Sequence, residues 1–192
     1  RVKLFALGGY SLAHAYLRFE KLKDGLSAGD VVILGYADFY DKRHVVAPSW
    51  LRSINNWIEK RDPDVSGRNF LWPKVSIDEG GGINVSYVPE NCAQNNSYCE
   101  GNDPSGAKMT GTTASLINYI CDNTQAKVYV LHVAGDTNNP VFTLIRDADR
   151  ISALPGDFDY FIRDDVEGFD PHPGPYWHYA ISRRLLQVLS ET

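Results

Sequence analysis

Residues 29–44 of the chain read GDVVILGYADFYDKRH. The part at 30–36 is a short run dominated by β-branched and other apolar residues, which is typical of a strand in a parallel sheet. Because the apolar residues are continuous and do not alternate with polar ones, we expect both faces of this strand to be buried. The residues that follow predict a loop rich in Asp and Tyr at the end of the strand.

Further apolar runs alternate with segments of helical spacing along most of the chain. We expect strands at 2–7, 127–133 and 158–162, and helices that include 12–22, 50–57, 112–124, 139–151 and 177–188. Strands that alternate with helices predict an α/β sandwich with a mainly parallel sheet. In such sheets, binding sites gather beyond the carboxyl ends of the strands.

Residues 62–108 break this alternation, since they are rich in Pro, Gly and Asn. Within them, 75–88 predicts two short strands joined by a glycine turn. We interpret 62–108 as a surface insertion in one domain that covers 1–192. Cys92 and Cys99 lie in a polar loop of this insertion, where we expect a short disulfide, whereas Cys121 lies in an apolar helical pattern and is expected to be a buried thiol.

The composition limits the classes of partner. Hydrophobic residues make up 43% and charged residues 22% of the chain, and the formal net charge is −5. No stripe of Lys and Arg is present, so nucleic acid is not expected as a partner. No apolar run approaches the roughly 20 residues that a membrane span needs. The sequence does not indicate an oligomeric state.

The first residues of the sequence and its cysteines bear on upstream segments and on the cellular location. Residue 1 is Arg, and an apolar run begins directly after it, so we expect further residues upstream that could include a signal peptide or a strand. The loop cysteines favour an extracellular or periplasmic location.

The stretch 168–186, GFDPHPGPYWHYAISRRLL, places Asp170 two residues before His172 at the expected start of a helix. A carboxylate beside a His can fix the tautomer of the imidazole and stabilise its protonated form, as a catalytic base requires. A polar loop that only caps the helix explains the same residues. Local features alone favour the cap slightly.

Three segments together resemble successive blocks of the SGNH (GDSL-type) hydrolase family: LFALGGYSLAHAYLRFEKL (4–22), GDVVILGYADFYDKRH (29–44) and DPHPGPYWHYAISRRLL (170–186). The resemblance implies a three-layer α/β/α sandwich, similar to a flavodoxin-like arrangement, and an esterase or acyltransferase that needs no cofactor or metal. It implies His172 as general base, Asp170 as the residue that orients it, and the Gly9 N–H as part of the oxyanion hole. The implied substrates are small acyl esters, including acetylated carbohydrate.

Two features depart from the family pattern. The family nucleophile is a Ser in a Gly-Asp-Ser block, which residues 1–192 do not contain, so we expect it upstream of residue 1. Ala37 stands where the family has an Asn that donates a hydrogen bond to the oxyanion, and losing one such donor typically lowers the rate about 100- to 1000-fold. Asp38 and His44 remain candidate pocket residues beside Ala37.

Other functions stay open at this point. A non-catalytic member of the same fold, used for binding or assembly, is favoured by Ala37. A metal pair of His132 and Asp136 is conceivable, but its spacing matches no zinc motif. Gly8-Gly9 lacks the spacing of a dinucleotide site. His44 lies in the loop after the strand, where it could contact substrate, although such a residue is more often simply solvated.

Overall fold

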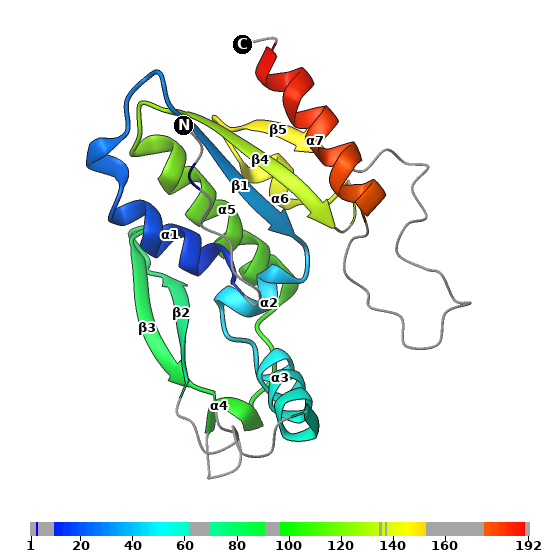
Figure 1. Ribbon diagram of the computed structural model, residues 1–192. Helices are drawn as coiled ribbons and strands as arrows, with labels where there is room; N and C mark the ends of the chain where they lie inside the picture. Colours follow the sequence, from blue (N-terminus) through cyan, green and yellow to red (C-terminus); the bar gives the residue numbers. More distant parts are fainter. Residues whose placement is uncertain are drawn as a thin grey trace.

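The computed structural model describes residues 3, 10–61, 70–90, 97–134, 136, 138–152 and 175–190 (Figure 1). Its strands are β1 (Val31–Ala37), β2 (Leu71–Ile77), β3 (Ile83–Pro89), β4 (Lys127–Ala134) and β5 (Asp149–Ser152). Its helices are α1 (Leu12–Glu20), the 3-10 turn η1 (Lys23–Gly25), α2 (Tyr40–His44), α3 (Pro48–Arg61), α4 (Ser97–Glu100), α5 (Gly106–Asp122), α6 (Val141–Leu144) and α7 (Pro175–Ser190).

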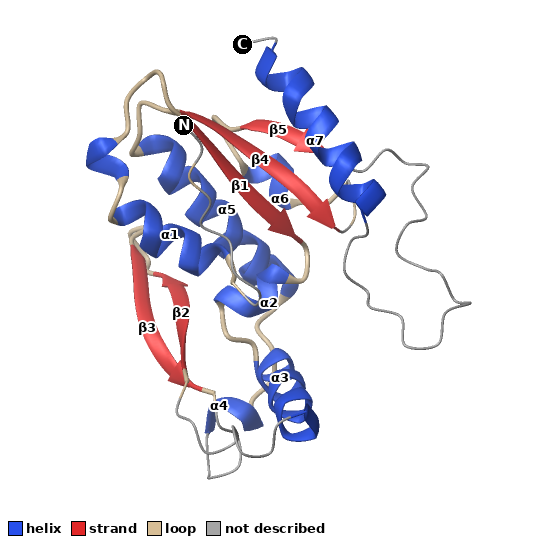
Figure 2. Cartoon of the chain, in the orientation of Figure 1, coloured by secondary structure: helices blue, strands red, loops and turns tan. Residues whose placement is uncertain are grey.

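Three of the strands form a parallel sheet in the order β1-β4-β5, and β2 and β3 form a separate antiparallel pair (Figure 2). Val31 pairs with Lys127 at one end of β1, and Tyr36 pairs with His132 at the other. The predicted mixed α/β fold with a parallel sheet is therefore confirmed. This register sets the carboxyl ends of β1 and β4 next to each other.

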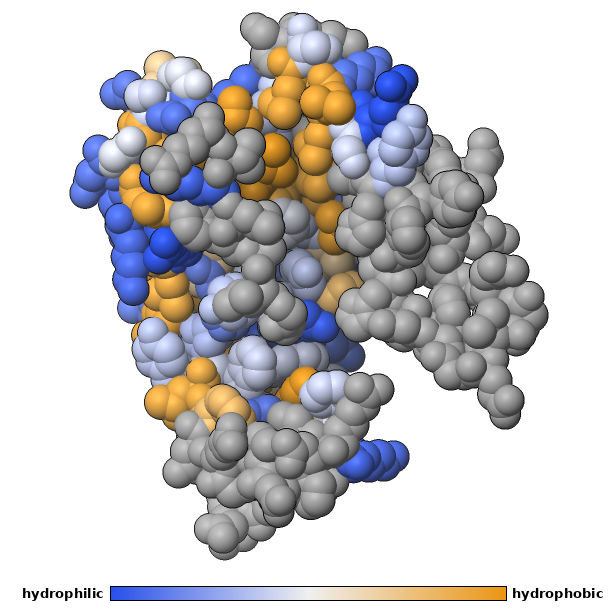
Figure 3. Space-filling view, in the orientation of Figure 1, coloured by the Kyte–Doolittle hydropathy of each residue, from blue (hydrophilic) through white to orange (hydrophobic). Residues whose placement is uncertain are grey.

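The core lies between this sheet and the helices α1 and α5. Side chains alternate along β1, so that Leu34 and Tyr36 are buried against the helices while Val31 and Ile33 are 45% and 41% exposed. In Figure 3, which has the orientation of Figure 1, apolar side chains gather on the surface in the upper middle of the view, over the parallel sheet. The expectation that both faces of β1 are buried is wrong, because its continuous apolar run is covered on one side only.

Helix α5 supplies much of this core. It begins at Gly106, earlier than the sequence predicts, because the Ser105 side chain caps it by accepting a hydrogen bond from the Lys108 N–H at 3.3 Å. Leu116, Ile117 and Ile120 follow at helical spacing and are fully buried. Because α5 also contacts α1 and β4, it ties the first helix to the sheet.

The predicted hairpin is confirmed as β2 and β3. Its turn is built around Asp78, whose carboxylate accepts hydrogen bonds from the N–H groups of Gly80 and Gly82. Gly81 has φ of +83°, a conformation that favours glycine. Val75 of this hairpin is buried in the main core, so the hairpin packs onto the domain.

The chain after β4 differs from the predicted helix at 139–151. Only Val141–Leu144 is helical, as α6, and Asp149–Ser152 is the strand β5. The cause is Asn118 of α5, whose side chain donates to the Leu144 carbonyl and accepts from the Arg146 N–H, both at 2.9 Å. This side chain satisfies the backbone groups that a longer helix would have used internally.

The predicted strand at 158–162, and all of the predicted strand at 2–7 except Lys3, lie outside the described residues. In the part of the chain that the structure describes, no helix combines the length and apolar character that crossing a bilayer requires.

Candidate functional site

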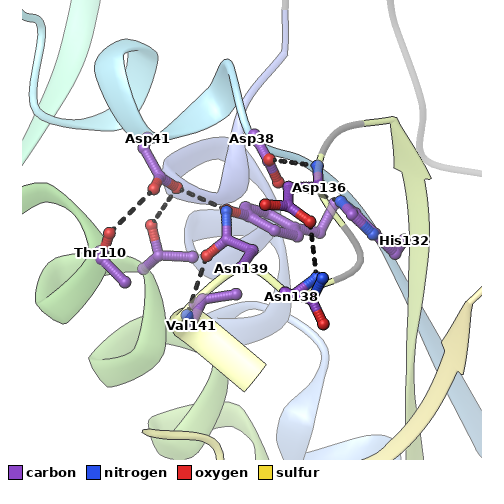
Figure 4. A network of polar contacts seen from close by, with 10 residues as sticks. Asp38, Asp41, Thr110, His132, Asp136, Asn138, Asn139 and Val141 are labelled. Carbon is purple, nitrogen blue, oxygen red and sulfur yellow. Dashed lines mark hydrogen bonds and ion pairs between the residues drawn. The ribbon is translucent and has the colours of Figure 1, made fainter. Parts of the chain in front are cut away.

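The carboxyl ends of β1 and β4 carry a cluster of polar side chains (Figure 4). Asp38 follows β1 directly, and its Oδ1 lies 3.0 Å from Nε2 of His132 near the end of β4. The side chain of Asp38 is 29% exposed, whereas that of His132 is 1% exposed. The pair therefore presents a carboxylate to solvent and keeps the imidazole inside.

The imidazole of His132 is held by aromatic rings. It stacks on Tyr36 with ring centroids 5.6 Å apart and meets Phe142 edge-on at 4.9 Å. Its Nδ1 is buried and has no hydrogen-bond partner among the residues that the structure describes. Since an ionised carboxylate can only accept, the proton of this contact lies on His132 Nε2. The ring thus acts as a fixed donor to Asp38.

The loop after β4 completes the cluster around Asp38. The N–H of Asp136 donates to Asp38 Oδ2 at 2.7 Å, and the Asp136 side chain accepts from the Asn138 N–H at 2.8 Å. The register shifts between Tyr36 and Ala37, a bulge-like irregularity at the point where both strands end. Such irregularities re-aim side chains near the ends of strands.

A second, buried network lies on the inner side of Tyr36. The Tyr36 hydroxyl donates to Asp41 Oδ1 at 3.0 Å, and the hydroxyls of Thr113 and Thr110 donate to the Asp41 oxygens at 2.6 and 3.4 Å. Burial raises the pKa of Asp41, and these three hydroxyl donors oppose that effect. Asn139 links the two networks because its side-chain amide donates to the Tyr36 hydroxyl at 3.2 Å.

His44 belongs to this buried network. Its Nε2 lies 2.8 Å from the Thr113 hydroxyl, and the residue is 0% exposed. The Thr113 hydroxyl also lies within hydrogen-bond distance of Asp41 Oδ1, at 2.6 Å, and of the Met109 carbonyl, at 3.2 Å. Burial lowers the pKa of His44 to about 3, so the ring is neutral at physiological pH. The interpretation of His44 as a solvated loop residue is wrong, because the short helix α2 turns its side chain into the core.

Ala37 is fully buried, and its methyl side chain supplies no side-chain donor at the carboxyl edge of the sheet. Ser11, two residues after Gly9 in the sequence, caps α1. Its N–H donates to His14 Nδ1 at 3.2 Å, and the His14 ring stacks on Tyr10. Burial lowers the pKa of His14, so this neutral ring serves the helix end.

The remaining predicted site residues, His172, Asp170 and Gly9, lie outside the described residues, as does Cys92. Cys99 is disulfide-bonded, and Cys121 is a free, half-buried thiol whose pKa burial raises to about 11. Within the ranges given above, the structure shows no group of three or more His, Cys, Asp or Glu side chains that could hold a metal ion.

The sequence analysis did not predict the contact between Asp38 and His132. It paired His132 only with Asp136, as a conceivable metal site. A usable signal was present, because both residues follow or end apolar runs that predict neighbouring parallel strands. The burial of Asp41 and Thr113 carries no such signal, since it depends on how α2 meets α5. No family model, curated protein or solved structure matches the chain.

Proposed function

We propose that this protein is an ester hydrolase of the Ser-His-Asp type that works at the carboxyl edge of its parallel sheet. The observation that carries the proposal is the position of GYAD, Gly35–Asp38, at the end of β1, where the Asp38 carboxylate is held by His132 and by the loop after β4. Sites of open α/β sheets form at this edge. The sequence resemblance supplies the reaction class.

In this proposal His172 takes the proton of a serine nucleophile and returns it to the leaving oxygen, while Asp170 orients the imidazole. The Gly9 N–H stabilises the tetrahedral oxyanion. Substrates are small acyl esters, including acetylated carbohydrate. These roles come from the matching motif positions, and residues 1–192 contain no Gly-Asp-Ser block for the nucleophile.

Two further parts of the proposal, the layered architecture and the cellular location, are supported by different observations. A three-layer α/β/α sandwich is supported by α1 and α5, which pack together against one face of the parallel sheet (Figure 1). An extracellular or periplasmic location is supported by the disulfide bond of Cys99, since disulfides persist in oxidising compartments.

The test is a fluorophosphonate probe on the full-length protein, together with hydrolysis of p-nitrophenyl acetate. We expect one serine to be labelled, and His172→Ala to lower kcat/KM by about a thousandfold or more. His178→Ala, in α7, is the matched control and keeps both labelling and turnover. Turnover that survives His172→Ala, or a wild-type protein that is neither labelled nor active, contradicts the proposal.

A non-catalytic binding or assembly protein is the second candidate, and the buried Ala37 favours it. Without an oxyanion donor at this position, the sheet edge could bind a ligand and leave its ester intact. Ala37→Asn separates the two candidates. It raises the hydrolysis rate of a weak enzyme, but it leaves a binding protein without turnover.

A further inference from the structure

The Asp38 carboxylate is fixed on one side and open on the other. Each of its oxygens receives one donor from the protein, His132 Nε2 on Oδ1 and the Asp136 N–H on Oδ2. Two carboxylate oxygens offer about four acceptor positions, so roughly half remain free. With 29% of the side chain exposed, these free positions are accessible from solvent.

An ionised carboxylate can only accept hydrogen bonds, so a ligand that meets Asp38 must bring a donor. We propose that Asp38 accepts a hydrogen bond from a hydroxyl group on the alcohol part of the ester, and that His132 is the positioning residue that holds it there. This inference rests on the proposed hydrolase function and names its substrate class as esters of polyhydroxylated alcohols, such as sugars. Esters whose alcohol part is anionic are disfavoured, since the exposed Asp136 adds a second negative charge at the same edge.

His132 is suited to positioning because its ring is buried and fixed in orientation. Its plane is set by Tyr36 and Phe142, and among the residues that the structure describes its one polar contact is Asp38. It cannot touch a ligand directly. Its effect on binding must therefore pass through the orientation of the Asp38 carboxylate.

The test compares two esters on the full-length protein: p-nitrophenyl acetate, which has no hydroxyl, and a monoacetylated methyl glucoside. Asp38→Asn removes the acceptor charge with little change in shape. His132→Phe keeps the aromatic packing and removes the donor, whereas His132→Gln retains an N–H donor. Asp24→Asn, in the turn η1, is the matched control, because it removes an exposed carboxylate that is not part of this cluster.

We expect Asp38→Asn and His132→Phe to raise the KM for the sugar ester, relative to the KM for p-nitrophenyl acetate, by about ten- to hundredfold, the size expected for one charged hydrogen bond. His132→Gln restores most of this ratio, and Asp24→Asn stays within about twofold of the wild type. Equal losses on both esters, no rescue by His132→Gln, or an equal effect of Asp24→Asn overturn the inference.

A second measurement does not depend on turnover. The carboxyl carbon resonance of Asp38 is followed by NMR while methyl glucoside is added to the full-length protein. A saturable shift in the wild type that is lost in His132→Phe supports the inference, and no saturable shift in the wild type overturns it. A protein that shows the shift but hydrolyses neither ester contradicts the hydrolase proposal alone, so the two failures are distinguishable.

Discussion

Acidification should destabilise this protein through His44, and the size of the effect can be worked out. The pKa of His44 is about 3 in the folded protein, against 6.5 for an ordinary His, because its ring is buried beside Thr113. The unfolded chain therefore binds the proton more readily than the folded one between these two values. Stability that is present above pH 6.5 is lost as the pH falls through this window.

One proton changes the free energy of unfolding by about 1.4 kcal/mol per pH unit, so His44 alone removes about 3 kcal/mol between about pH 6 and about pH 4. Asp41 acts in the opposite direction, because its pKa is raised in the folded state and proton uptake below that raised pKa favours folding. The titration of Asp41 is common to the wild type and to a His44 variant. The difference between their free energies of unfolding therefore reports the effect of His44, apart from coupling through Thr113.

The assay is urea unfolding of the wild type and of His44→Gln, under non-reducing conditions, at several values between about pH 7 and about pH 4. His44→Gln retains an amide group that can bond to the Thr113 hydroxyl, but it does not titrate. We expect it to be less stable near pH 7 and to lose stability more slowly on acidification, so that the two curves converge. Parallel curves would show that the His44 ring does not stay neutral in the folded protein, and would refute the reasoning.

Three further predictions concern stability and reactivity. Tyr36→Phe removes the hydroxyl shared by Asp41 and Asn139 and should lower the free energy of unfolding by about 1–3 kcal/mol, measured by urea unfolding. Asn118→Ala removes both bonds that end α6 and should cost about 1–3 kcal/mol, with faster amide exchange at Arg146, whereas unchanged exchange would contradict this role. Cys121, with a pKa of about 11, should react with iodoacetamide about a hundredfold more slowly than an ordinary thiol near pH 8 in the folded protein, and at an ordinary rate after unfolding.

The elements that could be predicted from the sequence are those whose pattern is local. The apolar runs of β1 and β4, the helical spacing of α5 and the glycine turn of the hairpin each identify an element without reference to the rest of the chain. The pattern at 139–151 misleads because Asn118 binds the backbone there. A side chain from a helix earlier in the sequence thus decides where α6 ends.

The candidate site could be predicted from the sequence only in part. Asp38 follows from its place after a strand and from the family resemblance, but its partner does not. The contact with His132 depends on the register that pairs Tyr36 with His132, and sequence patterning does not determine the register between parallel strands that lie far apart in the chain. The exposed face of β1 was missed for a related reason, since an apolar run shows what a strand can bury and not what covers it.

Tyr36 connects the interior of the molecule to its polar edge. Its hydroxyl is part of the buried Asp41 network, and its ring supports His132, which in turn holds Asp38. The orientation of the Asp38 carboxylate depends on His132, and the position of the His132 ring depends on Tyr36. We therefore expect Asp38 to keep its orientation on heating as long as Tyr36 stays packed. The polar edge should therefore melt together with the hydrophobic interior, as one cooperative unit, and not as a separate early event.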